Sequence, residues 1–387
     1  MGLPNLPGEA KTESDTAITP ALTSSEIDDG SWKELSPHKD EEQVQLDVNR
    51  AFIYYPSRKN PSAPTMSQNS ALVPVALLRE PPAWYHESLH AANSPLADQS
   101  TSELDRQKRE LSDVIVQVLR RYPFLCYFQG YHDICQVFLL VLPAPLRAPL
   151  VARLSALRIR DFMLPNLAPA VAQLRLIPDI LRAADPTLWR HLSHTEPFFA
   201  LSGTLTMYAH DVQSLGEIAR LFDVLLAREP VFSVYMFAQI VLNRRAELFD
   251  TPESEPEMLH SILSKLPQPL DLDGLIRDTT VLFQRHPPEK LRAWRGISRN
   301  SVLKTARSTE DCARQSIEDG REFFRKQVIE LRLAEARDKV MAVAWRYRRP
   351  ARAVGLAVIV GVVAYLLRRS PASWTSLTSW LSRLIGH

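Results

Sequence analysis

The stretch RYPFLCYFQGYHDICQVFLLVL, residues 121–142, joins an aromatic cluster to a long apolar run through a short polar segment. The apolar run, ICQVFLLVL at 134–142, predicts a buried helix. Buried positions rarely carry many hydrogen-bonding side chains unless each has a partner. The polar segment QGYHD at 129–133 is therefore a candidate functional site at the start of a central helix.

The rest of the chain predicts an all-α fold. Its 387 residues include 12 glycines and 29 prolines, and hydrophobic residues make up 45% of the chain, enough for a sizeable core. Apolar residues recur mainly at three- and four-residue spacing rather than in alternation. The segment 103–122, for example, places Leu111, Ile115, Val118 and Leu119 on one helical face.

Charge and cysteine content exclude some classes of protein. The formal net charge is +2, which argues against a nucleic-acid-binding surface covering the molecule. Cys126, Cys135 and Cys312 show no CxxC spacing, so we expect reduced thiols in the cytosol. The N-terminus has neither the basic nor the apolar region of a secretory signal.

Composition divides the chain into four parts. Residues 1–30 are rich in Pro, Ser, Thr and acidic residues and predict a disordered segment. Residues 31–287 hold the helical domain, with a long insertion at 57–102. Residues 288–340 are charged and amphipathic and predict a helical linker. Residues 341–387 are a basic segment, an apolar run and an amphipathic tail.

The apolar run at 353–367, AVGLAVIVGVVAYLL, predicts a membrane anchor. As a helix it covers roughly 22 Å, against a hydrocarbon core of about 27–30 Å, and flanking arginines can extend toward the lipid head groups. The excess of Lys and Arg before the run favours a cytosolic position for the helical domain. A buried core helix fits poorly, because arginines bracket both ends. The tail aligns Trp374, Leu377, Leu381 and Leu384 on one face, so a spanning helix and an in-plane anchor both remain open.

Three short stretches resemble the signature motifs of TBC domains, the GTPase-activating proteins of Rab GTPases. They are VQLDVNRAF at 44–52, YFQGYHDI at 127–134 and ARLFD at 219–223. The extension YHDI resembles the branch of the family anchored in the endoplasmic reticulum, which also ends in a hydrophobic anchor. The resemblance covers roughly residues 32–287. It implies a multi-helix TBC domain on the cytosolic face of the endoplasmic reticulum or Golgi, acting on a Rab in traffic from the endoplasmic reticulum to the Golgi.

The resemblance also implies roles for individual residues. Arg50 would supply an arginine finger and Gln129 a glutamine finger to the partner's nucleotide site. Asp47 would pair with Arg50, and Gly130 would allow a close approach or a sharp turn into the helix. The remaining supporting residues are Tyr127, His132, Asp133 and the expected ion pair Arg220–Asp223.

The chemistry of GTP hydrolysis suits these residue types. An arginine supplied in trans stabilises the charge that develops on the phosphates, through a planar fork of donors that stays protonated. A glutamine carries both a donor and an acceptor, so it can orient the attacking water. The chain has no GxxxxGK[ST] phosphate loop, so Mg²⁺ and GTP would come with the partner, and we expect no cofactor of its own. It is better described as a GTPase activator than as a stand-alone enzyme.

Each assignment has an alternative. Arg50 could be a surface arginine paired with Asp47, and Gln129 could cap the helix. The dipeptides His132-Asp133 and His210-Asp211 suggest a metal-dependent phosphohydrolase, but no further ligands stand out at consistent spacing, so we expect no metal. The alternative function is a membrane-anchored helical scaffold that binds a Rab or another trafficking protein with weak or no catalysis.

Overall fold

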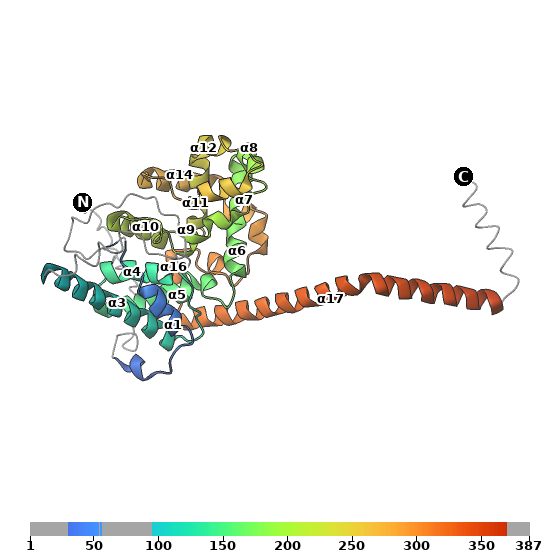
Figure 1. Cartoon of the computed structure of the whole chain (residues 1–387), viewed down its shortest axis with the longest axis horizontal. Coiled ribbons are helices and arrows are strands. Elements are labelled where there is room, and N and C mark those ends of the chain that lie inside the picture. Colours follow the sequence, from blue (N-terminus) through green and yellow to red (C-terminus); the bar gives the residue numbers. More distant parts are fainter. Residues whose placement is uncertain (1–29, 54, 56–94, 370–387) are drawn as a thin grey trace, which may run out of the picture. The chain divides into compact units, whose positions relative to one another are not determined.

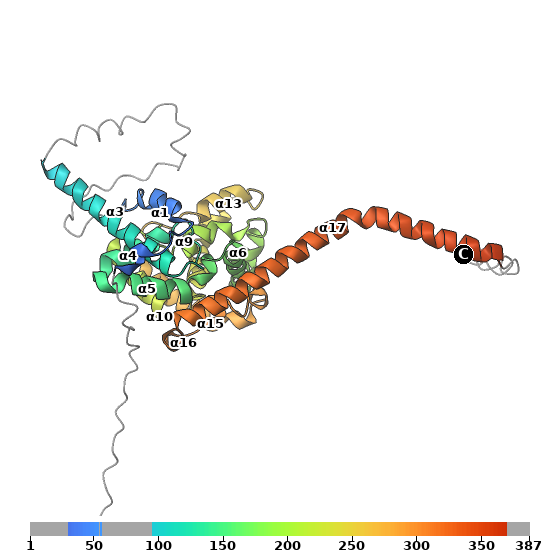
Figure 2. The same ribbon diagram turned by 90° about the horizontal axis from the view of Figure 1, so that it is seen from below.

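The helix that begins at Tyr131 lies inside the protein, as its apolar sequence predicts. The computed structural model describes residues 30–53, 55 and 95–369. In it, α4 (Tyr131–Val141) is buried over most of its length. Helices α3 (Pro95–Arg121) and α5 (Ala144–Leu157) pack against α4 and against each other, and the three lie together in both views (Figures 1 and 2). The predicted apolar face of 103–122 is buried in this group, which confirms that prediction.

Short helices surround this group. Helix α1 (Glu41–Val48) packs against both α3 and α4. Within the residues described, every regular element is a helix, which confirms the all-α prediction. The other elements up to residue 205 are η1 (Ser31–Glu34), η4 (Arg160–Phe162), α6 (Ala168–Leu174), α7 (Leu176–Ala184), α8 (Pro186–His191), η5 (Pro197–Ala200) and α9 (Leu201–Leu205).

A second buried helix, α11 (Phe232–Asn243), organises the following part of the domain. Its sequence FSVYMFAQIVLN is almost entirely apolar, and it packs against α7, α9 and α14 (Leu272–Arg285). Helix α10 (Leu215–Ala227) contacts both α4 and α14, so it joins the two helical groups. The remaining elements of this part are α12 (Arg245–Phe249) and α13 (Pro256–Leu263).

The structure differs from the predicted domain boundary at residue 287. The first compact unit continues to Gln327 and includes η6 (Pro288–Lys290), η7 (Ala293–Gly296), α15 (Val302–Thr305) and α16 (Thr309–Arg314). Side chains from these elements enter the core, among them Leu291, Trp294, Ile297 and Leu303. The sequence suggested a solvated linker because several very short helices do not produce the apolar spacing of one long amphipathic helix.

The second unit begins at Val328 and is formed by the continuation of α17 (Ile317–Arg369). Large apolar side chains from Leu356 to Leu366 are exposed on this helix. Among the residues that the structure describes, no helix combines the length and apolar character needed to cross a membrane. The predicted N-terminal segment, residues 57–94 of the predicted insertion, and the tail from 370 lie outside the described residues, whereas 95–102 form the first turns of α3.

Candidate functional site

Gly130 makes the turn that starts α4. It caps the helix with φ of 97° and ψ of −8°, a left-handed conformation that side chains with a Cβ rarely adopt. A Cβ built on Gly130 would lie 2.6 Å from Cγ2 of Thr206, so the segment after α9 also requires glycine here. The predicted sharp turn into the helix is confirmed, and it leaves Gln129 just outside the helix.

The Gln129 side chain is exposed at this turn. The N-terminus of α4 has no side-chain cap, so Gln129 does not act as the capping residue considered as the alternative. No hydrogen bond holds its carboxamide within residues 30–53, 55 and 95–369. The side chain therefore keeps both its donor and its acceptor available to a partner molecule.

Arg50 follows the end of α1 and is the second exposed member of the candidate site. Its Nη2 lies 2.7 Å from Oδ1 of Asp47, and its side chain is 64% exposed. Its backbone N–H donates to the carbonyl of Asp47 at 3.0 Å, which closes the turn after the helix. The predicted Asp47–Arg50 pair is confirmed. One nitrogen of the guanidinium is held by the pair, and the side chain otherwise faces solvent.

Asp47 is the residue that ties the two motifs together. Its carboxylate is completely buried and accepts hydrogen bonds from Arg50, from Nε2 of Gln43 at 3.0 Å and from the hydroxyl of Tyr127 at 2.9 Å. A buried carboxylate is costly unless its oxygens are satisfied, so this geometry is strongly favoured over a rearranged one. Tyr127 lies 80 residues from Asp47 and two residues before Gln129. The Asp47–Tyr127 hydrogen bond therefore fixes the Arg50 segment beside the Gln129 segment.

Further hydrogen bonds hold the Arg50 segment in place. The backbone N–H of Phe52 donates to Oε1 of Gln136 on α4 at 3.2 Å. Nζ of Lys108 on α3 donates to the carbonyl of Asn49 at 2.7 Å. At the other end of α1, Asp40 accepts from the backbone N–H of Tyr127 at 2.9 Å. The backbone on both sides of Arg50 is thus attached to the two central helices.

His132 and Asp133 lie behind the turn and continue the polar network. The Tyr127 hydroxyl is 3.3 Å from Nδ1 of His132, and Nε2 of His132 is 3.3 Å from Oδ1 of Asp133. Asp133 Oδ2 is in turn 3.2 Å from Nδ1 of His210. Burial lowers the pKa of His132, although Asp133 and Asp47 oppose this, whereas the hydrogen bond to Asp133 raises the pKa of His210. The network connects the turn at Gly130 to the segment after α9.

The second His-Asp dipeptide joins this network through its histidine. A metal site that includes His210-Asp211 is the alternative that the sequence suggests. In the structure, His210 contacts Asp133. Across the described parts of the chain, no cluster of three or more His, Cys, Asp or Glu side chains is arranged to hold a metal ion. The two dipeptides are thus neighbours in a hydrogen-bonded network.

Arg220 and Asp223 do not form the expected ion pair with each other. Arg220 lies 3.8 Å from Asp273 on α14, and both of these side chains are largely exposed. Asp223 is exposed on α10, where it lines a cavity together with residues from the second half of α4. The contacts of these two residues therefore lie with α14 and with that cavity, rather than with Arg50 or Gln129.

Several residues of this site, among them Gln43 and Thr206, were not predicted from the sequence. Gln43 supports Asp47 from one helical turn earlier, and the four-residue spacing was a usable signal. Thr206 packs against Gly130 from a distant segment, and nothing in the local sequence indicates that contact.

A family model and the sequences of known relatives indicate the same protein family. A model of the Rab-GTPase-TBC domain family matches residues 92–249, a range that includes Gln129 but not Asp47 or Arg50. The GTPase-activating protein gyp10 of Schizosaccharomyces pombe is 37% identical over 233 residues, which cover 59% of this chain and 62% of that protein. TBC1 domain family member 20 of Mus musculus is 33% identical over 273 residues, 69% of this chain and 67% of its own length. The GTPase-activating protein GYP8 of Saccharomyces cerevisiae is 22% identical over 186 residues, 40% and 37% of the two chains. The chain thus spans about two thirds or less of the length of these relatives.

Proposed function

Because the chain belongs to the Rab-GTPase-TBC domain family, we propose that it accelerates GTP hydrolysis by a Rab GTPase, supplying Arg50 and Gln129 in trans. One observation carries the proposal: two exposed side chains of the required types extend from segments that a buried Asp47–Tyr127 hydrogen bond holds together. The names of two relatives, gyp10 and GYP8, describe them as GTPase-activating proteins, which supports the same activity.

Arg50 has the properties of an arginine finger. Phosphoryl transfer is accelerated mainly by positioning and by stabilising the charge that develops on the phosphate oxygens. The Asp47 pair fixes one edge of the guanidinium, which limits the rotamers that must be ordered when the partner binds. The exposed nitrogens remain available as donors to the phosphates. A lysine in this place would offer a point charge without the planar fork.

Gln129 has the complementary role. Its carboxamide oxygen accepts a hydrogen bond from the attacking water, and its N–H group can donate to the partner. The turn at Gly130 places this side chain outside the helix, and α4 behind it is rigidly packed. Mg²⁺ and GTP belong to the partner, so the chain contributes protein side chains alone.

Single-turnover hydrolysis by a panel of GTP-loaded Rab GTPases tests the activator proposal. We expect the wild-type chain to accelerate at least one Rab, and Gln129→Ala to lower that rate by about 10²–10³-fold, since one preorganised catalytic hydrogen bond has an effect of this size. Gln239→Ala on α11 is the matched control, because Nε2 of Gln239 donates to Oδ1 of Asn243 on its own helix, away from Arg50 and Gln129, and this variant should behave as wild type. If every Rab hydrolysed GTP at the same rate with and without the chain, the activator proposal would be wrong and the scaffold function would be favoured.

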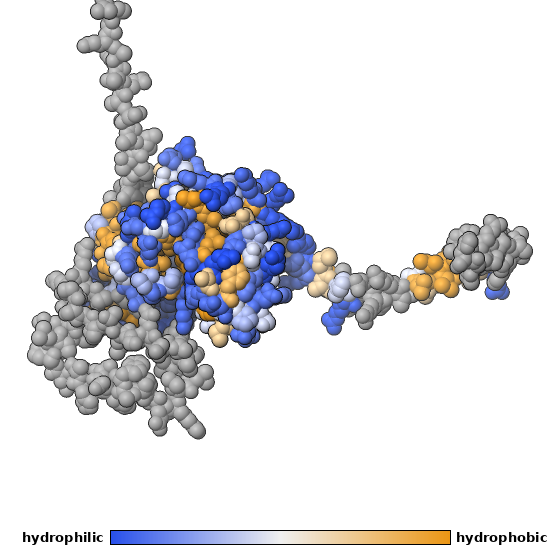
Figure 3. Space-filling model, turned by 90° about the horizontal axis from the view of Figure 1, so that it is seen from above, coloured by the Kyte–Doolittle hydropathy of each residue, from blue (hydrophilic) through white to orange (hydrophobic). Residues whose placement is uncertain are grey.

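The proposal extends to a location at a membrane of the early secretory pathway, the endoplasmic reticulum or Golgi, with the helical domain on the cytosolic side. The support is the exposed apolar run of α17, which includes Leu356, Ile359 and Val363 and appears as the orange surface of that helix in Figure 3. An apolar surface of this kind is unfavourable in water and favours a lipid or protein environment. Arg368 and Arg369 follow the run and suit the head-group region. Membrane attachment would raise the effective concentration of the chain toward a Rab on the same surface.

Fractionation of cells that express tagged variants tests the membrane location. A chain ending at residue 340 should move from the membrane to the soluble fraction. The full chain with Ile359→Asp and Val363→Asp should do the same, because each charge costs about 2.5–3.5 kcal/mol near the centre of a bilayer. Leu333→Asp, at an exposed position on the same helix before the apolar run, is the control. If the shortened chain sediments with membranes as the full chain does, the run at 353–367 is not the anchor.

A further inference from the structure

A large cavity lies at the opposite end of α4 from Gln129. Its volume is about 630 Å³, and helices α4, α5, α10 and α16 form its walls. The walls are mainly apolar, with Phe138, Leu154 and Phe222 among the side chains that line them. Pockets that bind small organic ligands have volumes of about 300–1,000 Å³ and mainly apolar walls, so this cavity has the size and surface of a ligand site.

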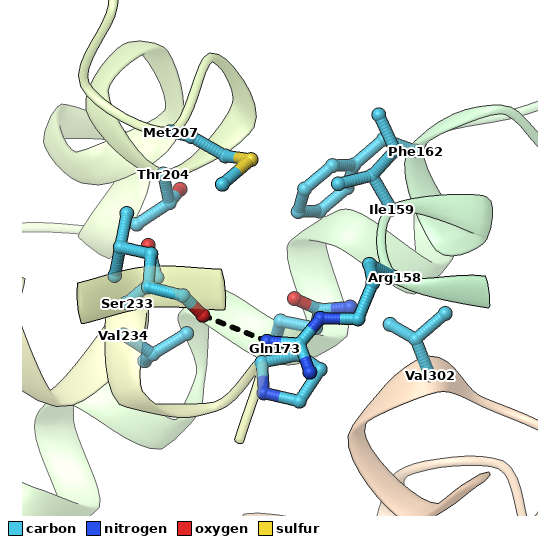
Figure 4. Close-up of a pocket in the computed structure, with 11 residues that line it drawn as sticks. Arg158, Ile159, Phe162, Gln173, Thr204, Met207, Ser233, Val234 and Val302 are labelled. Atoms are coloured by element: carbon cyan, nitrogen blue, oxygen red, sulfur yellow. Dashed lines mark hydrogen bonds between the residues drawn. The ribbon is translucent and has the colours of Figure 1, made fainter. Parts of the chain in front are cut away.

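The cavity is open to solvent, because Val141 and Asp223 in its wall are exposed, and its mainly apolar lining favours an occupant that is itself apolar. A smaller cavity, which Arg158 also lines, is shown in Figure 4 and contrasts with the larger one. Gln173, Thr204 and Met207 line the smaller cavity, and its volume of about 30 Å³ has room for little more than a water molecule. The larger cavity is thus the one that suits an organic ligand.

The charged side chains in the wall indicate the charge of the ligand. They are Arg153, Arg158 and Asp223, so the lining itself carries a net charge of +1. In the described part of the chain neither arginine pairs with a carboxylate. Nη2 of Arg153 donates to the carbonyls of Cys312 and Gln315, each at 3.0 Å, which leaves its other nitrogens uncommitted.

More of the guanidinium nitrogens of Arg158 than of Arg153 have a polar partner. Nη2 of Arg158 donates to the carbonyls of Leu225 and Arg228 at the end of α10, and its Nη1 lies 3.6 Å from the sulfur of Cys312. These hydrogen-bond partners are neutral, and the carboxylate of Glu229 interacts electrostatically with Arg158, which offsets part of its charge. Arg153 is therefore the side chain able to bind an anionic group, because a guanidinium fork matches a carboxylate.

From this combination we propose that the cavity between α4, α5, α10 and α16 binds a free long-chain carboxylic acid. The hydrocarbon chain lies among the apolar side chains, and the carboxylate pairs with Arg153. This site is separate from Arg50 and Gln129, and its occupancy can be measured without any GTPase. Failure of either proposal would therefore leave the other standing.

Photolabelling of the full chain in neutral phosphatidylcholine vesicles tests this site. Three photoreactive probes with the same alkyl chain are compared: a fatty acid, the corresponding fatty alcohol and an anionic phospholipid. Mass spectrometry of the labelled peptides locates the adducts. We expect the fatty acid to label peptides from the four cavity helices at least about tenfold more than the alcohol does, as a charge-assisted hydrogen bond implies. Equal labelling by acid and alcohol, or labelling by the phospholipid alone, would overturn the proposal.

Two variants give independent checks. Ala219→Trp places an indole in the cavity and should lower labelling by the acid about tenfold or more, whereas Ala227→Trp, at an exposed position of the same helix, should not. Arg153→Gln keeps a donor for the carbonyls of α16 but removes the charge, so labelling by the acid should fall to that by the alcohol. Urea unfolding of each variant shows whether it is folded. If Ala219→Trp is unfolded, Arg153→Gln alone tests the site. Labelling of Arg153→Gln by the fatty acid at the wild-type level would contradict the pairing of the carboxylate with Arg153.

Discussion

Replacing Arg50 by alanine should lower the rate of Rab GTP hydrolysis in the presence of the chain by about 10³–10⁵-fold, the effect of an arginine supplied in trans. The loss should be catalytic rather than structural. The Arg50 side chain is 64% exposed, so solvent screens its charge even though its partner Asp47 is completely buried. Asp47 keeps its hydrogen bonds from Gln43 and Tyr127 when Arg50 is removed, so the buried carboxylate remains satisfied. Arg50→Lys should recover only a small part of the rate, because an ammonium lacks the planar fork.

The chain offers a closely matched control for Arg50. Arg106 on α3 is 60% exposed and also pairs with an acidic residue three positions earlier, Glu103, at 2.7 Å. Arg106→Ala therefore removes the same side chain from an ion pair of the same spacing, whose acidic partner is 38% exposed where Asp47 is buried. It should leave both the hydrolysis rate and the unfolding midpoint near wild type. If Arg50→Ala and Arg106→Ala gave the same single-turnover rate, Arg50 would be an ordinary surface arginine.

The sequence predicted the parts of the fold and site that depend on local spacing. The apolar run at 134–142 was enough to place α4 in the interior. Asp47 and Arg50 are three residues apart, so their ion pair follows from helical geometry. Gly130, directly after Gln129, predicted a sharp turn, because few other residues adopt the left-handed backbone conformation that such a turn requires.

The parts that the sequence did not predict depend on contacts between distant segments. The hydrogen bond from Tyr127 to Asp47 spans 80 residues, and the packing of Thr206 against Gly130 has no local signal. Arg220 and Asp223 share a helical face, but the position of α14 makes Asp273 the partner of Arg220. The sequence of residues 288–327 predicts a linker, because the side chains that enter the core there come from helices too short to show periodicity.

Arg160 is the clearest buried group that local sequence reasoning could not place. Its side chain is completely buried, and its guanidinium donates to Oε1 of Gln327 at 3.0 Å and to the carbonyls of Ala156 and Asn300, each at 2.6 Å. It also lies 5.1 Å from the ring of Phe323. Burial lowers its pKa to about 10, so it remains charged at neutral pH. The group holds the first turns of α17 against the end of α5.

Asp161 completes this buried network from the neighbouring position. Its carboxylate accepts from Nε2 of Gln327 and from Nε2 of Gln173, each at 2.8 Å, and from the backbone N–H of Val302 at 3.1 Å. Gln327 thus bridges the two charged residues through its carboxamide. Each buried charge depends on the other for its compensation, because the low dielectric of the interior strengthens both the attraction and the cost of losing it.

Arg160→Met should therefore lower the free energy of unfolding by about 3–5 kcal/mol, although methionine is long enough to occupy much of the same space. The substitution leaves the carbonyls of Ala156 and Asn300 without their donor and leaves Asp161 as an uncompensated buried charge. Such a change is large beside a total stability of about 5–15 kcal/mol. Urea unfolding followed by tryptophan fluorescence measures it, with Arg106→Met as the exposed control, expected within about 0.5 kcal/mol of wild type. At a temperature where the variant is folded, its single-turnover rate per folded molecule should equal that of wild type, because Arg160 lies outside the Arg50 and Gln129 network. An unfolding midpoint equal to that of wild type would show that the buried network contributes little to the stability of the domain.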